Sequence, residues 1–289
     1  MEFKICLGGL LFHIQSDRSL ILDPEYAPFL RTEGKADIEV RISWDWEKAR
    51  YPSGPKLGED LIQEYYEEDT TGICLVKGGR KGYMAATCYN RDFRHMKCTI
   101  HEAPFRQPPK NLGQIMRFLP IRAAFLHFGV LFFHAAQIEM QGRGILFTAP
   151  SGTGKTTQAD LWQRYERARL ICNDRTLVRR MYGKWTTYGY PIDGSKPVGS
   201  GEILPLGAVV LLGQAEMDKA ERIRGIKSAA KLLPQLVIDG WNGEEREQAV
   251  SLLLQLQQDI PIYRFECTNS RNAVVCLKER LRKDGIIEG

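Results

Sequence analysis

The sequence of 289 residues lacks an apolar run long enough to cross a membrane. Its longest apolar stretch, residues 118–133, is interrupted by Pro120, Arg122 and His127 and is shorter than the ~20 residues that a bilayer-spanning helix requires. The first residues contain a short apolar segment, but no small-residue cleavage site follows it, as a secretory signal would need. We therefore expect no membrane partner and a cytoplasmic location.

The sequence also lacks the cysteine spacing of a metal or disulfide framework. It has seven cysteines, an odd number, and none of them forms a C-x-x-C pair or a His/Cys cluster at zinc spacing. Buried, reduced thiols are therefore expected. The cysteines are Cys6, Cys74, Cys88, Cys98, Cys172, Cys267 and Cys276.

A strong charge of one sign is missing too. The formal net charge is +5, and the excess of basic residues falls after residue 110, whereas the first 110 residues are close to neutral. An excess this weak and dispersed argues against DNA or RNA as a partner, but it suits an anionic ligand. The sequence contains no internal repeat and no low-complexity segment.

What is present divides into two parts, at the proline-containing segment 105–111. Residues 1–110 contain short β-prone segments and predict a smaller, mostly β N-terminal domain of unassigned role. Within it, the alternation at 38–44 predicts a half-buried antiparallel strand, and the acidic stretch 58–69 predicts a solvated helical face. The remaining part, 111–289, alternates strands with helices and predicts an α/β domain, which begins with a helix kinked at Pro120.

One motif dominates the second part. Residues 149–156, APSGTGKT, match a Walker A phosphate-binding loop with Ala149 in place of the first glycine, and they lie between a predicted strand and a predicted helix. Gly152 and Gly154 allow the backbone N–H groups to turn toward phosphates, and the N-terminus of the following helix adds its positive dipole end. Lys155 can approach the β- and γ-phosphates. The predicted nucleotide-binding residues are Ser151, Gly152, Thr153, Gly154, Lys155, Thr156 and Thr157.

Two further residues are candidates for chemistry. Asp174 follows the apolar strand at 170–172, where it can hold Mg²⁺ together with the Thr156 hydroxyl or accept a proton from an attacking hydroxyl. His134 ends the run VLFFH before the strand that leads into the loop. A histidine beside an apolar run is typically a satisfied core residue, so its position alone does not assign it to the site.

The segments FHAAQIEMQGRGILFTAPSGTGKTTQADLW and RLICNDRTLV together resemble the catalytic domain of HPr kinase/phosphorylase. In that family a histidine precedes a G-x-S-G-x-G-K-[ST] loop, and a later strand ends in paired aspartates followed by arginine. By this resemblance His134 matches the histidine, Asp174 matches the second aspartate, which acts as the base, and Arg175 matches the arginine. The implied fold is a phosphoenolpyruvate-carboxykinase-like P-loop domain with a mixed sheet. The likeness is close over residues 130–180 and looser beyond.

The sequence departs from this family at several positions. Asn173 replaces the first aspartate, so one metal ligand is neutral, and Ala135 follows the histidine where glycine is common. The family's later basic, glycine-rich signature is replaced by residues 188–197, YGYPIDGSKP, which argues against HPr as the substrate. This segment looks more like that of divergent HPr-kinase-like enzymes associated with peptide modification, some of which phosphorylate a serine of a lasso-peptide precursor.

These observations predict an ATP- and Mg²⁺-dependent kinase that phosphorylates a serine of a peptide or protein. Lys155, Asp174 and His134 are the expected catalytic residues, and the expected metal ligands are Thr156, Asp174 and Asn173. Residues near the rim are expected to contact the substrate, namely Arg175, Asp193, Ser195 and Lys196. Two alternatives stay open, a kinase of free serine or a similar small alcohol, and a nucleotide-dependent binding or switch protein. The sequence leaves open whether the chain forms a homo-oligomer.

Overall fold

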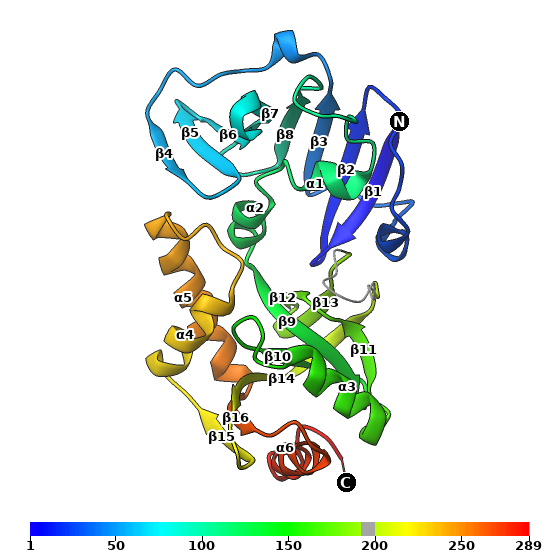
Figure 1. Ribbon diagram of the computed structural model, residues 1–289, viewed down its shortest axis with the longest axis vertical. Helices are drawn as coiled ribbons and strands as arrows, with labels where there is room; N and C mark the ends of the chain where they lie inside the picture. Colours follow the sequence, from blue (N-terminus) through cyan, green and yellow to red (C-terminus); the bar gives the residue numbers. More distant parts are fainter. Residues whose placement is uncertain (192–199, 289) are drawn as a thin grey trace. The chain divides into compact units, whose positions relative to one another are not determined.

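The computed structural model describes residues 1–191 and 200–288 (Figure 1). The chain divides into two compact units: Met1–Phe128 with Asp239–Glu245, and Gly129–Ile238 with Arg246–Gly289. The division after Phe128 differs from the boundary expected near residue 110, because the two short helices between residues 112 and 127 belong to the first unit. The segment Asp239–Glu245 lies between two parts of the second unit in the sequence but belongs to the first unit. No local sequence signal indicated this.

The first unit is built on one mixed sheet with short helices. In the described part of the chain its eight strands follow the order β1-β2-β3-β8-β7-β6-β5-β4. Its strands are β1 (Glu2–Leu7), β2 (Leu10–Ser16), β3 (Ile38–Ser43), β4 (Lys56–Glu59), β5 (Gln63–Glu68), β6 (Thr71–Lys77), β7 (Tyr83–Asn90) and β8 (His95–Ile100). Its helices are the 3-10 turns η1 (Pro24–Phe29), η2 (Trp46–Lys48) and η3 (Gly79–Lys81), and α1 (Leu112–Met116) and α2 (Ile121–His127).

Alternating side chains give this sheet a buried face. Strand β2 alternates buried and half-buried residues along its length, and Phe12 on its buried side meets Phe125 of α2 edge to face, with ring centroids 6.1 Å apart. Strand β3 alternates as predicted, but it pairs in parallel with both β2 and β8, so the antiparallel prediction is wrong. The chain between β2 and β3 is long enough to cross over, which parallel pairing requires.

The acidic stretch 58–69 forms two strands rather than the predicted helical face. Strands β4 and β5 pair as an antiparallel hairpin. Gln63 and Tyr65 point inward and are buried, while Glu64 and Tyr66 lie on the other side and are half-buried. At the turn, Asp60 accepts hydrogen bonds from the backbone N–H groups of Ile62 and Gln63, both at 2.7 Å. The period of two, set by the burial of Gln63 and Tyr65, outweighs the helix propensity of the glutamates.

The predicted kinked helix over 112–128 is also two separate helices. Helix α1 ends at Met116, and Pro120 occupies the N-cap of α2. Proline lacks the N–H that a continuous helix would need at this point, so the chain breaks instead of bending.

The segment Asp239–Glu245 is held in the first unit by a buried ion pair. Arg122 of α2 lies 2.7 Å from Asp239, whose side chain is inaccessible to solvent, and it also contacts Asp60 and the Tyr65 hydroxyl. Trp241 packs on Tyr65 with ring centroids 5.1 Å apart. Burial raises the pKa of Asp239, and the charge of the adjacent Arg122 guanidinium opposes this shift.

The second unit contains the predicted α/β arrangement. Within the described residues its sheet follows the order β10-β9-β12-β13-β14-β16-β15, with β11 paired to β9. Its strands are β9 (Val130–Met140), β10 (Arg143–Thr148), β11 (Arg169–Cys172), β12 (Arg175–Met181), β13 (Lys184–Gly189), β14 (Ile203–Gln214), β15 (Lys219–Ile223) and β16 (Ile262–Cys267). Its helices are α3 (Lys155–Glu166), α4 (Ile226–Leu232), η4 (Leu233–Gln235), α5 (Gly243–Asp259) and α6 (Arg271–Lys283).

The strand pairings close a ring in this unit. Strand β9 pairs with β12 through its first half and with β10 through its second half, while β14 joins β13 to β10. Gly144 of β10 faces the inside of this ring, where a Cβ atom would lie 2.3 Å from the Thr187 side chain. Only glycine fits such a close approach.

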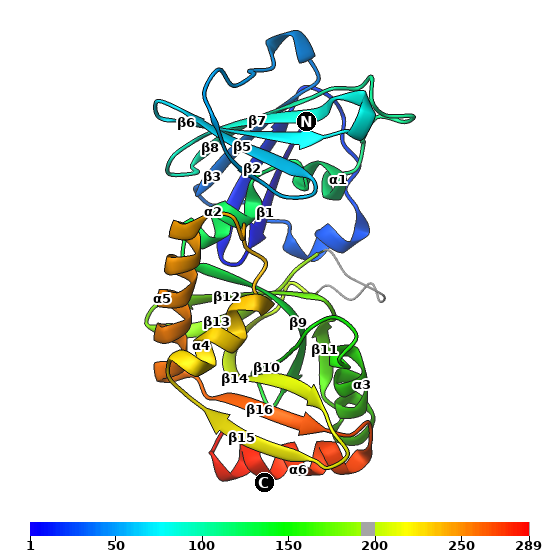
Figure 2. The same ribbon diagram turned by 60° about the vertical axis from the view of Figure 1, so that its left-hand side comes forward.

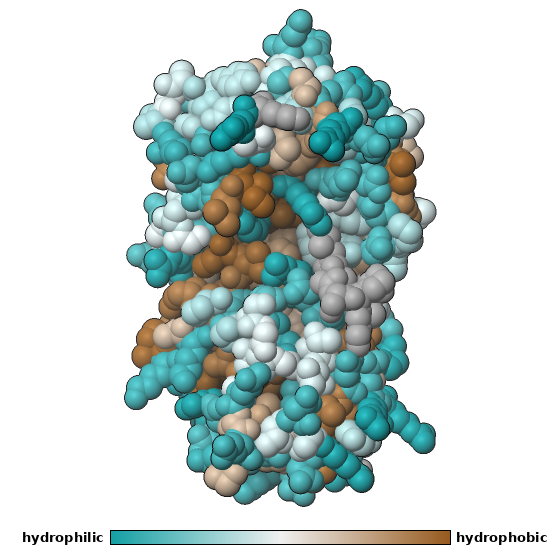
Figure 3. Space-filling view, viewed as in Figure 1, coloured by the Kyte–Doolittle hydropathy of each residue, from teal (hydrophilic) through white to brown (hydrophobic). Residues whose placement is uncertain are grey.

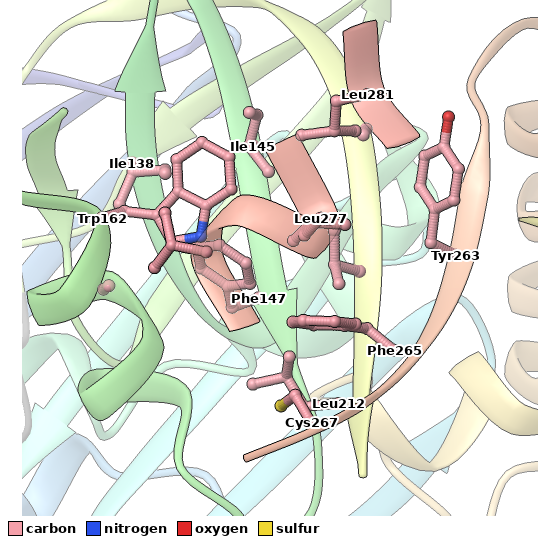
Figure 4. Packing of buried hydrophobic residues seen from close by; sticks show 14 of the residues in the cluster. Ile138, Ile145, Phe147, Trp162, Leu212, Tyr263, Phe265, Cys267, Leu277 and Leu281 are labelled. Atoms are coloured by element: carbon pink, nitrogen blue, oxygen red, sulfur yellow. The ribbon is translucent and has the colours of Figure 1, made fainter. Parts of the chain in front are cut away.

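Helices cover both sides of these strands. Helices α3 and α6 contact each other, and α4 and α5 lie on the other side of β14 and β16 (Figure 1, Figure 2). Figure 4 shows the core under α3 and α6, where Trp162 lies near Phe147, and Leu277 and Leu281 approach β14 and β16. In Figure 3, hydrophobic residues gather over α4 and α5, where Ile226 is 64% exposed.

The sequence-based assignments hold for most of this unit. Strands β9, β10 and β14, the β12–β13 hairpin and helices α3, α5 and α6 form where they were expected. Ser270 caps α6 by accepting a hydrogen bond from Asn272 N. The edge strand β15 was not predicted, because its short, largely exposed sequence carries little periodic signal. In the described part of the chain, no helix is both long and apolar enough to span a bilayer.

Candidate nucleotide-binding site

The glycine-rich loop joins β10 to α3, as its sequence predicts. Gly152 and Gly154 have φ values of +79° and +108°, which side chains rarely tolerate, although a Cβ at either position would meet no atom within 4 Å. The backbone conformation, rather than lack of space, therefore requires glycine here. Gly154 is the N-cap of α3 and has no side-chain cap. The first N–H groups of α3 are thus free of a capping side chain, as an anion site at a helix N-terminus needs.

Lys155 lies folded along the loop. Its Nζ donates to the backbone oxygens of Ala149 at 2.9 Å and Pro150 at 3.3 Å, and the residue is only 8% exposed. Burial lowers the pKa of Lys155, while the nearby Asp174 carboxylate opposes this shift. Carbonyl oxygens are weaker partners for an ammonium than phosphate oxygens, so a bound phosphate can take the ammonium from them.

Asp174 and His134 meet across two neighbouring strands. His134 on β9 is the register partner of Arg175 on β12, and Ala135 N donates to the backbone oxygen of Asp174 at 3.1 Å. This backbone pairing brings His134 Nε2 to 2.8 Å from Asp174 Oδ1, and Arg175 Nε lies 3.4 Å from Asp174 Oδ2. The hydrogen bond from His134, and then the charge of Arg175, lower the pKa of Asp174. The carboxylate is therefore ionised at neutral pH.

The loop and this pair face one cavity of about 270 Å³. Most of the sequence-predicted site residues line it together. They are His134, Ser151, Gly152, Gly154, Lys155, Thr156, Thr157, Asn173 and Asp174. Thr153 belongs to the loop but not to this lining, and Arg175 reaches the site through its contact with Asp174. The expected substrate residues Asp193, Ser195 and Lys196 lie outside the described part of the chain.

Several supporting residues were not singled out from the sequence. The Thr148 hydroxyl donates to His134 O at 2.9 Å and ties the end of β10 to β9. Gln158 of α3 donates to Thr268 O at 3.1 Å, which anchors the helix to the chain after β16. Gln158 is a buried polar residue one turn into α3. Its position on the buried face of the helix is the sequence signal that could have identified it as a supporting residue.

A buried polar network lies inside the strand ring, next to the site. Cys172 Sγ is 2.8 Å from the Thr176 hydroxyl, and the Thr187 hydroxyl donates to Gln137 Oε1 at 3.0 Å. Cys172 and Thr176 stand on either side of Asn173 and Asp174, so their contacts restrain the short connection that carries the carboxylate. All seven cysteines are free thiols. Cys74, Cys98, Cys172 and Cys267 are buried as expected, whereas Cys6, Cys88 and Cys276 are only half-buried.

The oxygen donors in the cavity suit Mg²⁺ only in combination with a nucleotide. Thr156, Asn173 and Asp174 supply a hydroxyl, an amide oxygen and a carboxylate, which are the ligand types that Mg²⁺ prefers. Across the described residues there is no cluster of three or more His, Cys, Asp or Glu side chains able to hold a metal ion by itself. Mg²⁺ usually keeps several waters and binds with substrate phosphates, so this donor set fits it.

Fold and site together define the second unit as an α/β domain with a mixed sheet, in which a glycine-rich loop connects a strand to a helix and faces a carboxylate. The family model described as "SynChlorMet cassette protein ScmC" matches residues 111–273, more than half of the chain, and the chain belongs to this family. The match contains the loop, His134 and Asp174, and it leaves out the strands of the first unit.

The comparison with solved structures found the Hpr(Ser) kinase/phosphatase from Coxiella burnetii. The two chains are 13% identical with a TM-score of 0.33, and the match covers 53% of this chain and 98% of that one. No curated protein matches the sequence.

Proposed function

We propose that the protein is an ATP- and Mg²⁺-dependent kinase that transfers the γ-phosphoryl group to a hydroxyl, namely a serine of a peptide or protein. The observation that carries the proposal is the shared cavity, in which the glycine-rich loop faces an ionised aspartate that is hydrogen-bonded to a histidine. A glycine-rich turn that bound no ligand would need neither Lys155 nor Asp174 beside it. The proposed fold of the second unit is of the phosphoenolpyruvate-carboxykinase-like P-loop type.

Each residue has a distinct proposed role. The backbone N–H groups of residues 151–156 and the Lys155 ammonium bind the triphosphate and neutralise charge that develops during transfer. Thr156 and Asp174, with Asn173, would hold Mg²⁺, which would supply charge neutralisation for the phosphates when bound. Because Asn173 is neutral, the metal would be held by one carboxylate instead of two.

Asp174 also serves as the acceptor of the hydroxyl proton. Its carboxylate is ionised at neutral pH and half-exposed toward the cavity, so an incoming hydroxyl can donate to it. His134 keeps one carboxylate oxygen in place and leaves the other for substrate, near Arg175. The protein's contribution is thus mainly placement and electrostatic stabilisation.

The family description names a cassette protein and no substrate, and a peptide is the acceptor that we propose. A cassette protein is one of a set, and a substrate produced within the same set would explain a kinase that lacks the HPr-recognition signature.

The decisive experiment is a phosphoryl-acceptor screen. The full chain is incubated with ATP and Mg²⁺ and either with peptides encoded beside its gene or with free serine, and products are identified by mass spectrometry. Phosphorylation of a peptide serine supports the proposal, whereas phosphorylation of free serine alone would make the enzyme a small-molecule kinase. Tight nucleotide binding without transfer to any acceptor would contradict the kinase proposal and favour a nucleotide-dependent switch.

A further inference from the structure

The sheet of the first unit has a partly uncovered outer face. At one end, Trp46 and Ala49 pack against Ile73, Leu75 and Ala86 and form a small core on this face. Toward β3 and β8 the same face is hollowed by a cavity of about 440 Å³. This cavity lies in the unit that does not carry the glycine-rich loop, and neither the fold nor the proposed reaction accounts for it.

Two cations stand side by side in this cavity. Arg41 on β3 is the direct register partner of Lys97 on β8, and both residues are exposed. Like charges directly opposite each other on neighbouring strands destabilise a sheet. Within the described chain, neither side chain forms an ion pair that would offset this repulsion.

The neighbouring charged groups leave these cations unneutralised. Glu39 lines the same cavity, but its Oε2 is 2.8 Å from His13 Nδ1 and is therefore engaged on β2. His95, the register partner of Glu39, adds a third basic side chain to the lining. The cavity as a whole therefore favours an anion.

The rest of the lining indicates what kind of anion fits. Cys88 is half-buried, so part of the surface is apolar, and Asn90 and Thr71 offer amide and hydroxyl groups. A small inorganic anion would contact the two cations and leave the apolar part of the lining exposed. A peptide with an acidic side chain next to an apolar one uses both, and the volume is large enough for several side chains.

We propose that the outer sheet face around Arg41 and Lys97 is a docking site for an acidic segment of a peptide. This inference rests on the proposed peptide-kinase function, because docking in the first unit would raise the effective concentration of the acceptor serine at the reaction site. Acidic side chains of the bound segment lie against Arg41 and Lys97, and an adjacent apolar side chain covers Cys88.

Fluorescence anisotropy with the full chain tests the proposal. The probes are a short fluorescein-labelled peptide of alternating Glu and Val and its counterpart with Gln in place of Glu. The acidic peptide should bind more tightly than the Gln peptide, and added salt should weaken it. The double variant R41E/K97E should bind the acidic peptide about tenfold more weakly or worse, as expected for losing and reversing two exposed charge contacts. R41Q/K97Q, which avoids new carboxylates on the sheet, should show a smaller loss in the same direction.

The matched control is R106E/K110E, which makes the same change of net charge at two exposed positions of the first unit outside this cavity. It should bind the acidic peptide like the unmodified protein. Equal affinity of R41E/K97E and R106E/K110E would overturn the proposal. Displacement of the peptide by inorganic phosphate at comparable concentration would overturn it as well, since the cavity would then be a small-anion site.

Failure of this inference can be distinguished from failure of the proposed function. Binding of a fluorescent ATP analogue should be unchanged in R41E/K97E, and peptide binding should persist in Lys155→Ala. Phosphotransfer without acidic-peptide binding would reject the docking site alone. Acidic-peptide binding that depends on Arg41 and Lys97, with no transfer to any acceptor, would reject the kinase function alone.

Discussion

His134 Nε2 lies 2.8 Å from Asp174 Oδ1, and this hydrogen bond joins strand β9 to the chain that enters β12. It is the main reason why the pKa of Asp174 lies below its ordinary value, and Arg175 adds to the effect. The pair shares its cavity with the glycine-rich loop, so any acceptor that approaches a nucleotide on the loop also approaches this carboxylate.

Replacing His134 with alanine removes this hydrogen bond and tests its importance. Without the imidazole, the pKa of Asp174 should rise toward its ordinary value of 3.8. Since protonation removes the carboxylate, the acid loss of activity should begin at a higher pH than in the unmodified protein. At neutral pH the carboxylate is ionised in both proteins, and we expect kcat to fall about tenfold to a hundredfold through poorer placement. NMR titration of the Asp174 carboxyl carbon gives the pKa directly. An unchanged pKa would contradict the assigned cause.

Replacing Lys155 with alanine should abolish nucleotide turnover. The ammonium is the cation of the loop that can bind phosphate oxygens, and its loss should weaken ATP binding about tenfold to a hundredfold. Isothermal titration calorimetry measures the binding. Lys283→Ala, at the exposed end of α6, is the matched control and should bind ATP normally. Unchanged affinity in Lys155→Ala would show that the loop does not hold the triphosphate.

Replacing Asp174 with asparagine should separate binding from transfer. The amide cannot accept the hydroxyl proton, so transfer should fall about 10²- to 10⁴-fold, whereas nucleotide binding should persist. Single-turnover transfer and ATP binding are measured on the same preparation. Glu279→Gln, which alters an exposed carboxylate on α6, should leave both unchanged. Normal transfer by Asp174→Asn would refute the base assignment.

Glu245 should make the stability of the first unit depend on pH. Burial, and then the charge of Asp239, raise the pKa of Glu245 from 4.5 to about 7. The folded state therefore keeps a proton that the unfolded state releases, and the free energy of unfolding should fall as the pH rises from about 4.5 to about 7. Glu245→Gln should remove up to about 2 kcal/mol of this dependence.

Thermal unfolding at pH 5 and pH 8 measures the effect of Glu245. The neighbouring Glu244, which is exposed, provides the control variant Glu244→Gln, and this protein should keep the pH dependence of the unmodified chain. If Glu245→Gln and Glu244→Gln gave the same curves, Glu245 would not be the titrating group.

Replacing Arg122 with methionine should destabilise the first unit. The change leaves Asp239 buried without its cation, a situation that costs about 3–5 kcal/mol. Urea unfolding followed by tryptophan fluorescence gives the loss. The double variant R122M/D239N removes the uncompensated charge and should be more stable than R122M alone. A double variant as unstable as the single one would show that the Asp239 charge is not the cause.

Much of the second unit was predictable because its signals are local. The apolar strand β10, the two glycines and the amphipathic start of α3 follow one another in the sequence, and each element forms through contacts with near neighbours. The same holds for the β12–β13 hairpin and for the Ser270 cap of α6. Lys155 and Thr156 could be assigned to the site for this reason.

The pairing of distant segments was not predictable in the same way. The antiparallel assignment for β3 was wrong because strand direction depends on which strands come to lie on either side of it. The helical assignment for 58–69 was wrong because burial of Gln63 and Tyr65 against the sheet decides the conformation of this stretch. The ion pair between Arg122 and Asp239 joins residues far apart in the sequence, and the sequence around either residue does not indicate the other.

The sequence by itself determined that a glycine-rich loop lies between a strand and a helix, and it singled out His134 and Asp174 as candidates. Only the tertiary structure decided that these two side chains are hydrogen-bonded, that they face the loop across one cavity, and that Arg41 and Lys97 stand together on the outer sheet face of the first unit. The physical reason is that loop conformation follows from local backbone preferences, whereas the meeting of side chains follows from strand register, which is fixed by the packing of the whole unit.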